Sequence, residues 1–334
     1  MMKIDCLDRN AVAGAIDMPA AIAALKMAFI GYARGSAKNH PRSIFDTGED
    51  VSSLKLLTMS GSIATPPTLT TKVATVTPNN GKHNGLPLLH AMVVLVDGQT
   101  GQFKCLMEGT TFSAIKTGAM AGLVTDLLAD KNAGELAVIG CGEQAKTQIL
   151  AICSIRSINK ISLHSRTDTS ALALKQWIDI NLAQPPQVKV YASAAEAVAT
   201  ADIISTCTSK VDSRPLFEAT DIKPGVHINA IGGASLEAIE VAPQMLANAR
   251  VFVEDLSAAL RESNELKSAI KASHLVEQDI FTIGELLTTD ISPPLQDKAT
   301  TYFCSVGIAL QDAAIAGQIY HSAKALDLCQ SIQM

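Results

Sequence analysis

The chain has 334 residues, of which 48% are hydrophobic and 18% charged, and its formal net charge is -5. At roughly 150 residues per domain, this length predicts about two domains, each able to bury its own core. The acidic balance and the lack of a Lys or Arg run argue against nucleic acid or an anionic membrane surface as a partner. No stretch reaches the roughly 18 apolar residues that a membrane-spanning helix needs, and Asp5 and Asp8 are unlike a signal peptide. We therefore expect a cytoplasmic protein.

The cysteines are scattered along the chain and odd in number. There are seven, with no CxxC pair and no His at the spacing of a zinc finger. Small thiols in this pattern are typical of reduced, buried side chains in an intracellular protein. We expect neither disulfide bonds nor a metal site.

The first hundred residues combine one helical stretch with several strand-like runs. An apolar helix is expected at 18–35, and strands are expected at 52–61, 68–77 and 86–108. The last run contains the turn signal DGQTG at 97–101, which predicts a hairpin. This part of the chain is typical of an α+β domain dominated by antiparallel pairing.

From Thr110 the pattern changes to helices that alternate with strands. A long Ala-rich helix is expected at 111–129, and β-rich runs follow at 135–140, 160–166, 187–193, 201–208, 225–232 and 249–255. This alternation predicts a parallel, doubly wound sheet with crossover helices. Residues 300–329 are expected to form a second long amphipathic helix, which packs back on the first part of the chain.

The stretch AVIGCGEQA, at 137–145, lies at the first strand-to-helix turn of the doubly wound part. Gly140 permits a tight turn, and Gly142 lets the backbone approach a phosphate without a Cβ in the way. The N-terminus of the next helix offers unpaired N–H groups to the same anion. Ala145 replaces the third glycine of the usual motif. The pattern predicts a Rossmann fold that binds a dinucleotide.

The end of the second strand of this fold selects between the two nicotinamide cofactors. An NAD-specific site has Asp or Glu there to bind the ribose hydroxyls, whereas this strand ends in Ser165 and Arg166. A guanidinium suits a 2′-phosphate, because it can donate paired charge-assisted hydrogen bonds. We expect NADP(H) to be preferred over NAD(H), the alternative being a solvated arginine at a strand end.

Several longer stretches carry a resemblance to a known family. They are residues 68–80, 95–122, 137–145, 201–209, 225–241 and 305–323. In these the chain resembles the ornithine cyclodeaminase/μ-crystallin family over essentially its whole length. The resemblance implies a homodimer, with a substrate-binding and dimerisation domain at 1–112 with 308–334 and a Rossmann domain at 113–307. Known members of the family include cyclodeaminases, amino-acid dehydrogenases, cyclic imine reductases and a NADPH-dependent thyroid-hormone binder.

The resemblance also implies which residues hold the cofactor. They cluster in the glycine turn, at the ends of the following strands, and near the start of the Ala-rich helix: Lys116, Thr117, Gly140, Gly142, Glu143, Gln144, Ser165, Arg166, Thr167, Thr206, Thr208, Ile231, Gly232, Gly233 and Ser305.

Three cations are the candidate substrate ligands. Arg42 and Lys72 match the family positions that bind the substrate's α-carboxylate, and Lys116 stands where the family usually has arginine. Lys72 lies in an otherwise uncharged stretch that begins at Leu56, so a charge there calls for an anion. Arg42 can donate a fork of two hydrogen bonds, while Lys72 is a point charge and a candidate catalytic proton donor. Val306, beside Ser305, matches a position that lines the nicotinamide and substrate, the alternative for both being helix packing.

One departure from the family bears on the reaction. The cyclodeaminase pattern has an aspartate where this chain has Ala234, and alanine cannot transfer protons. Neither Glu254 nor Asp255 matches that acid. We expect an NAD(P)H-dependent imine reductase that converts Δ1-pyrroline-2-carboxylate to L-proline, and that also accepts the six-membered Δ1-piperideine-2-carboxylate to give L-pipecolate. The alternatives are an ornithine cyclodeaminase, an amino-acid dehydrogenase and a NADPH-dependent small-ligand carrier.

Overall fold

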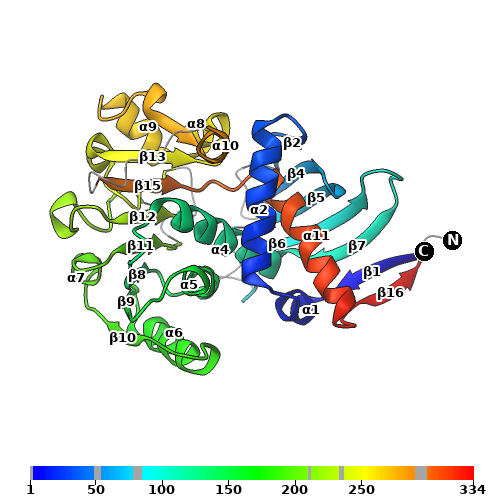
Figure 1. Cartoon of the computed structure of the whole chain (residues 1–334), viewed down its shortest axis with the longest axis horizontal. Coiled ribbons are helices and arrows are strands. Elements are labelled where there is room, and N and C mark those ends of the chain that lie inside the picture. The colour runs from blue at the N-terminus through cyan, green and yellow to red at the C-terminus, as the bar shows by residue number, and fades with distance from the viewer. Residues whose placement is uncertain (1–2, 49–53, 78–84, 210–211, 233–236, 290–298) are drawn as a thin grey trace. The chain divides into compact units, whose positions relative to one another are not determined.

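The computed structural model describes residues 3–48, 54–77, 85–209, 212–232, 237–289 and 299–334. The chain divides into two compact units, which Figure 1 shows with the order of their elements. The first unit comprises Met1–Lys116 with Gly307–Met334, and the second comprises Thr117–Val306. No described helix is long and apolar enough to cross a membrane. Among the same residues, no group of His, Cys, Asp and Glu side chains could hold a metal ion.

The first unit is built on an eight-stranded sheet. Its strands run in the order β16-β1-β7-β6-β5-β4-β2, and β3 also pairs with β4. The pairing is antiparallel except between β1 and β7. The bounds of its elements are β1 Lys3–Leu7, α1 Arg9–Gly14, α2 Met18–Ala33, β2 Ala37–Asn39, β3 Ser43–Asp46, β4 Lys55–Ala64, β5 Pro67–Val76, β6 Leu89–Asp97, β7 Phe103–Glu108, α4 Gly109–Leu128, α11 Ala309–Ala325 and β16 Gln330–Gln333.

The predicted hairpin is confirmed. Strands β6 and β7 pair antiparallel, and the turn between them is held by the Asp97 carboxylate, which accepts hydrogen bonds from the backbone N–H groups of Gln99 and Thr100. Gly101 follows with φ near 72°, a conformation that glycine adopts without strain. Local turn chemistry therefore helps to set the register of β6 against β7.

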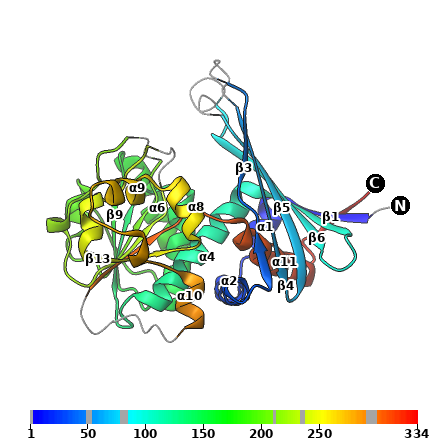
Figure 2. The ribbon, with the colours of Figure 1, turned by 90° about the horizontal axis from the view of Figure 1, so that it is seen from above.

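Helices α2 and α11 cover one face of this sheet. Both views of the molecule show them side by side, with α11 against β4 and β5 (Figures 1 and 2). A Cβ at Gly61, on β4, would collide with the backbone carbonyl of Ala309, so α11 begins in direct contact with the strand. This contact brings the first turn of α11 over the inward-facing side chains of the sheet.

The second unit has a parallel sheet of eight strands. Their order is β10-β9-β8-β11-β12-β15-β13-β14, and each pairing is parallel, as the fold-class prediction requires. Besides the remainder of α4, its elements are β8 Glu135–Ile139, α5 Glu143–Ile155, β9 Lys160–His164, α6 Asp168–Asn181, β10 Gln187–Val190, α7 Ala194–Val198, β11 Ile203–Thr206, η1 Ala219–Asp221, β12 His227–Ala230, η2 Pro243–Asn248, β13 Ala249–Val253, α8 Leu256–Glu262, α9 Asn264–Lys271, η3 Glu277–Asp279, β14 Ile280–Thr282, α10 Ile283–Thr288 and β15 Thr300–Cys304.

Hydrophobic cores lie on both faces of this sheet. Along β8, Leu136 and Val138 belong to one buried cluster, whereas Ala137 and Ile139 belong to the other. Because successive side chains of a strand point to opposite faces, burial on both sides explains why β8 is apolar from Leu136 to Ile139. The predicted α/β class, with a doubly wound sheet beside an α+β unit, is confirmed.

The expectation of one helix over residues 300–329 is wrong. Residues Thr300–Cys304 form β15, a buried strand between β12 and β13, and α11 begins only at Ala309. Gly307, with φ near 72°, separates the two elements. The run TTYFC is rich in β-branched and aromatic residues, and burial on both faces of a parallel sheet stabilises it as a strand. The expected packing of the C-terminal helix on the first part of the chain is confirmed for α11.

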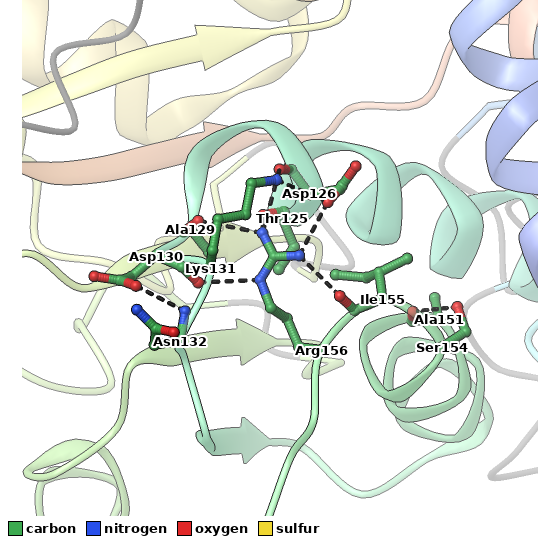
Figure 3. A network of polar contacts seen from close by, with 10 residues as sticks. All are labelled: Thr125, Asp126, Ala129, Asp130, Lys131, Asn132, Ala151, Ser154, Ile155 and Arg156. Atoms are coloured by element: carbon green, nitrogen blue, oxygen red, sulfur yellow. Dashed lines mark hydrogen bonds and ion pairs between the residues drawn. The ribbon is translucent and has the colours of Figure 1, made fainter.

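A buried arginine joins the ends of α4 and α5. The Arg156 guanidinium donates to the carbonyl oxygens of Thr125, Asp126, Ala129 and Asp130, at 3.0–3.2 Å, as Figure 3 shows. It also donates to the Asp126 carboxylate at 2.9 Å. The last carbonyls of a helix lack intrahelical partners, and this one guanidinium binds two of them in α4, Thr125 and Asp126, and two carbonyls just beyond the helix.

Candidate functional site

The predicted glycine turn connects β8 to α5. Gly140 has φ near 96°, and a Cβ there would lie 2.6 Å from the carbonyl oxygen of Cys207. Gly142 is the N-cap of α5 without a side-chain cap, and a Cβ there would point into open space. The turn therefore leaves the first N–H groups of α5 accessible, which is what a phosphate requires.

A cavity of about 550 Å³ opens at this turn. Six of the predicted cofactor residues line it together: Gly140, Gly142, Ser165, Arg166, Thr167 and Thr208. The structure thus brings the glycine turn and the end of β9 into one pocket, with the exposed Arg166 side chain on its wall. These residues would fit an adenosine diphosphate moiety, since the backbone N–H groups at the start of α5 could bind phosphates and Arg166 offers a cation on the same cavity wall.

Three more predicted residues lie close to the turn, although they do not line the cavity. Glu143 and Gln144 form the first turn of α5, where the Glu143 carboxylate pairs with Lys146 at 2.8 Å. The Thr117 carbonyl accepts a hydrogen bond from the Gln148 amide at 3.3 Å. Thr117 belongs to α4, whereas Glu143 and Gln144 belong to α5.

The ends of β11 and β12 hold another group of predicted residues. The backbone N–H groups of Ile231 and Gly232 both donate to the carbonyl of Thr206 at 3.0 Å. A buried carboxylate that the sequence did not indicate, Glu240, accepts hydrogen bonds from Thr206, Thr208 and Gly232. Gly233 and Ala234, also named from the sequence, lie outside the described residues.

Ser305 and Val306 follow β15 and share a second unpredicted carboxylate. The Ser305 hydroxyl donates to Oε1 of Glu254 at 2.6 Å, and the backbone N–H of Val306 donates to Oε2 at 3.1 Å. Glu254 is 1% exposed and directly follows β13. Neighbouring carboxyl ends of the parallel sheet thus place this acid beside the residues expected near the nicotinamide.

The predicted substrate cations Lys72 and Lys116 meet in the first unit. Lys72 occupies an inward position of β5 and forms an ion pair with Asp312, with 3.1 Å between Nζ and Oδ2. The Lys116 ammonium donates to the Gln311 amide oxygen at 2.8 Å and lies 3.8 Å from Asp312. The two lysines are 6% and 4% exposed, and Asp312 is fully buried. We call Lys72, Lys116 and Asp312 the buried charge cluster.

Arg42 joins the same part of the unit through the backbone. Its Nη2 donates to the carbonyl oxygen of Gly307 at 3.1 Å. A Cβ on Gly307 would lie 2.8 Å from the Lys116 ammonium, so this glycine holds one cation with its carbonyl and leaves room for another. Arg42 and Lys116 therefore both lie beside Gly307, which leads into α11, while Lys72 pairs with Asp312 on the helix itself.

Sequence reasoning missed Asp312, although a signal was present. It is the one Asp, Glu, Lys or Arg between Lys298 and Lys324 in the sequence. The argument that singled out Lys72, a charge in an uncharged stretch, applies equally to this carboxylate. Each of the two groups is the other's buried counterion.

Comparison with known proteins places the chain in a family. The profile of the ornithine cyclodeaminase/mu-crystallin family matches residues 2–327. The chain belongs to this family. A Δ1-pyrroline-2-carboxylate reductase of Bacillus cereus is 37% identical over 254 residues, which are 75% of this chain and 76% of the relative.

Solved structures of the family share the fold over nearly the whole chain. A Thermococcus litoralis Δ1-pyrroline-2-carboxylate reductase in complex with NADH and L-proline superposes with a TM-score of 0.89 at 27% identity, covering 98% of this chain and 100% of that one. An archaeal alanine dehydrogenase dimer with bound NAD superposes with a TM-score of 0.88 at 26% identity, covering all of both chains.

Proposed function

We propose that the protein is an NAD(P)H-dependent reductase of a cyclic imine carboxylate, with Δ1-pyrroline-2-carboxylate as substrate and L-proline as product. The observation that carries the proposal is the buried charge cluster, in which two ammonium groups face one carboxylate. A buried charge is stabilised when a group of opposite charge lies beside it. Arg42 donates to the Gly307 carbonyl beside Lys116, so the carboxylate of an imino acid bound there would meet three cations.

The similarity to pyrroline-2-carboxylate reductases favours this substrate class among the carboxylates. The Bacillus cereus relative carries that name, and the Thermococcus litoralis neighbour was solved with NADH and L-proline. The six-membered Δ1-piperideine-2-carboxylate has the same carboxylate and imine and one more methylene. We propose it as a second substrate, since one methylene changes binding in a pocket only modestly.

The residues of the second unit fit a nicotinamide dinucleotide. Gly140 and Gly142 would admit the pyrophosphate at the start of α5, and Ser165, Arg166 and Thr167 would face the adenosine ribose. The bound cofactor supplies the hydride that reduces the C=N bond. We propose a preference for NADP(H) with NAD(H) accepted, because Arg166 can pair with a 2′-phosphate and the acid that lines the cavity, Asp212, comes from the segment after β11 and not from the end of β9.

The chain's own groups divide the remaining work. Arg42 would hold the substrate carboxylate, and Lys116 would add positive charge beside it. Lys72 would both attract the carboxylate and lend a proton to the imine nitrogen, since only a protonated imine is a strong hydride acceptor. Asp312, Gln311 and Gly307 position these cations, which supplies the orientation that the reaction needs.

A second candidate is an amino-acid dehydrogenase that reduces an open-chain imine formed from a 2-oxo acid and ammonia. The similarity to an archaeal alanine dehydrogenase favours it, because the same cations would hold its carboxylate. An ornithine cyclodeaminase is disfavoured by Ala234, which lacks the acid that ring closure requires. A small-ligand carrier is disfavoured by the buried charge cluster, which has no role in binding an uncharged molecule.

One assay separates these candidates. NADPH and NADH oxidation is followed with pyrroline-2-carboxylate, with piperideine-2-carboxylate and with pyruvate plus ammonia, and ammonia release from L-ornithine is measured with NAD(P)+. The proposal expects oxidation with the cyclic imines and no ammonia from ornithine. Activity that depends on ammonia would instead establish the dehydrogenase. Proline formed from ornithine would overturn the argument from Ala234.

We also propose a homodimer formed through the first unit. The sheet face that points away from Lys72 carries Leu69, Met92 and Phe103, which the strand register places on one side and which are 40–46% exposed. Exposed apolar side chains on one sheet face mark an interaction surface. The archaeal neighbour described as a dimer favours a second copy as the partner.

In this proposal the first unit binds substrate and forms the dimer, while the second binds the dinucleotide. A cytoplasmic location is proposed on chemical grounds. The seven cysteines are free thiols, as is typical of a reducing compartment.

A further inference from the structure

Glu240 makes an unusual set of hydrogen bonds in the second unit. Its Oε2 accepts from the Thr206 hydroxyl at 2.7 Å and from the Gly232 N–H at 2.9 Å. Its Oε1 accepts from the Thr208 N–H at 2.9 Å and from the Thr208 hydroxyl. Each carboxylate oxygen therefore faces one backbone N–H and one hydroxyl.

This arrangement suits a carboxylate and no other side chain of its size. A glutamine would place an NH₂ group where one of the two oxygens lies. A hydroxyl can reverse its role and accept, but a backbone N–H cannot. Whichever way the amide turned, it would face the N–H of Thr208 or Gly232 with another donor.

The buried position of the Glu240 carboxylate is energetically unfavourable for its charged form. Glu240 is 1% exposed, and burial raises its pKa above the usual range. A second buried acid, Glu265, accepts a hydrogen bond from the Glu240 N–H at 2.8 Å and repels its negative charge. Buried ionisable groups with shifted pKa values are found preferentially at functional sites.

One of the three donor residues, Thr208, lines the cavity, and the other two lie at the ends of β11 and β12. Thr206 ends β11, Thr208 follows it, and Gly232 follows the end of β12. A Cβ at Gly140 would lie 2.9 Å from the Thr208 nitrogen, so the glycine turn rests directly on this residue. Thr208 and Gly140 both line the cavity. A shift of Thr208 would therefore displace the turn that is expected to hold the pyrophosphate.

We propose that Glu240 is a positioning residue of the dinucleotide site, which ties the ends of β11 and β12 beneath the glycine turn. The inference rests on the proposed binding of a nicotinamide dinucleotide in the same cavity. Because the tie lies under the part of the site that NADH and NADPH share, it supports both cofactors equally. Arg166, by contrast, would support only the phosphorylated one.

The test compares Glu240→Gln with wild type in direct binding of NADH and NADPH, followed by the fluorescence of the dihydronicotinamide. We expect the Kd of both cofactors to rise at least tenfold and by the same factor. At saturating cofactor, kcat and the KM of the imine should stay within about twofold of wild type. This split between cofactor affinity and turnover is not expected from a general loss of stability.

The matched control is Glu265→Gln, the same chemical change at the neighbouring buried acid. Glu265 bonds the Glu240 N–H and the Ser263 hydroxyl, not the strand ends, so cofactor Kd should change less than threefold even if the melting temperature falls. If Glu240→Gln does not fold, Glu240→Asp replaces it, since the shorter carboxylate keeps four acceptor sites and should weaken both cofactors to an intermediate degree.

Two results would overturn the inference. One is a Kd within twofold of wild type for folded Glu240→Gln, and the other is a loss confined to NADPH. A wild-type protein that binds neither cofactor would refute the proposed function itself, so the two failures are distinguishable.

Discussion

The Lys72 ammonium lies 3.2 Å from Oδ1 and 3.1 Å from Oδ2 of Asp312, so one buried carboxylate holds the cation through both of its oxygens. The side chains are 8% and 0% exposed. Since 240 positions separate them in the chain, the pair forms only when α11 packs on β5. Removing Asp312 would take the shared carboxylate from two buried ammonium groups, whereas removing Lys72 would leave Asp312 with Lys116 alone in the cluster.

The first prediction concerns the role of Lys72. Lys72→Ala should lower kcat by about a hundredfold or more, the usual scale for a positioned proton donor. Lys72→Arg should not restore it, because a guanidinium keeps the charge but gives up no proton near neutral pH. Steady-state kinetics with pyrroline-2-carboxylate would measure both.

Arg42→Ala is the matched control for charge alone. It should act mainly on KM, as loss of ground-state binding does. If Lys72→Arg regains most of the rate, Lys72 is an electrostatic anchor and the imine arrives already protonated from water.

The second prediction concerns Asp312. Asp312→Asn keeps the shape of the side chain but removes the negative charge between two buried ammonium groups. We expect kcat to fall by about ten- to a hundredfold, because small displacements of a reacting group have effects of this size. The exposed Asp327 offers a control just beyond the end of the same helix, and its Asn variant should have wild-type kinetics. Equal rates for wild type and Asp312→Asn would show that Lys72 needs no counterion for its position.

The third prediction concerns cofactor choice. Arg166→Ala should raise the KM for NADPH about ten- to a hundredfold while leaving that for NADH nearly unchanged. A partly exposed charge-assisted contact to the 2′-phosphate is worth about 1.5 to 3 kcal/mol. The KM values are measured with the imine held at saturation. Equal losses for both cofactors would refute the assignment.

The fourth prediction is a pH dependence of stability. His227, the first residue of β12, is 1% exposed, and burial lowers its pKa from 6.5 to about 3. Between these values the unfolded chain binds a proton that the folded chain does not. The free energy of unfolding should therefore decrease as the pH falls from about 6.5 toward 3, by up to about 1.4 kcal/mol per pH unit from this group.

His227→Gln should make this acid limb shallower in urea unfolding series at pH 4 to 7. The Gln variant of the exposed His90 is the control, because it removes one imidazole and leaves the buried His227 in place. An acid limb of unchanged slope in His227→Gln would show that other groups carry the effect.

The fifth prediction concerns the helix junction in Figure 3. Arg156→Met should lower the free energy of unfolding of the second unit by about 3 kcal/mol or more, since carbonyls at the end of α4 lose the guanidinium and the Asp126 carboxylate is left with Lys131. Arg156→Lys should recover only part of this loss, because one ammonium cannot reach carbonyls on several sides. Full recovery with lysine in thermal and urea melts would contradict the requirement for a planar guanidinium.

The local features of the fold could be predicted from the sequence because their causes are local. The turn at Asp97 and the glycine turn at Gly140 depend on neighbouring side chains and on backbone conformations that glycine allows. The apolar runs of β8 and β11 indicate strands buried on both faces. The family resemblance then indicated Arg42 and Lys72, because both match positions that bind the substrate's carboxylate in the family.

The features that only the tertiary structure decided depend on contacts between distant segments. Residues 300–304 border a helix along the chain, but pairing with β12 and β13 makes them a strand. Asp312 meets Lys72 only through the packing of α11 on the sheet, and Glu254 meets Ser305 because β13 and β15 are neighbours. Glu240 contacts Thr208 from 32 positions away. The residues next to a carboxylate along the chain do not indicate which distant group it contacts. The pairing of buried charges, and the acids that hold the site residues in place, are therefore determined only by the folded structure.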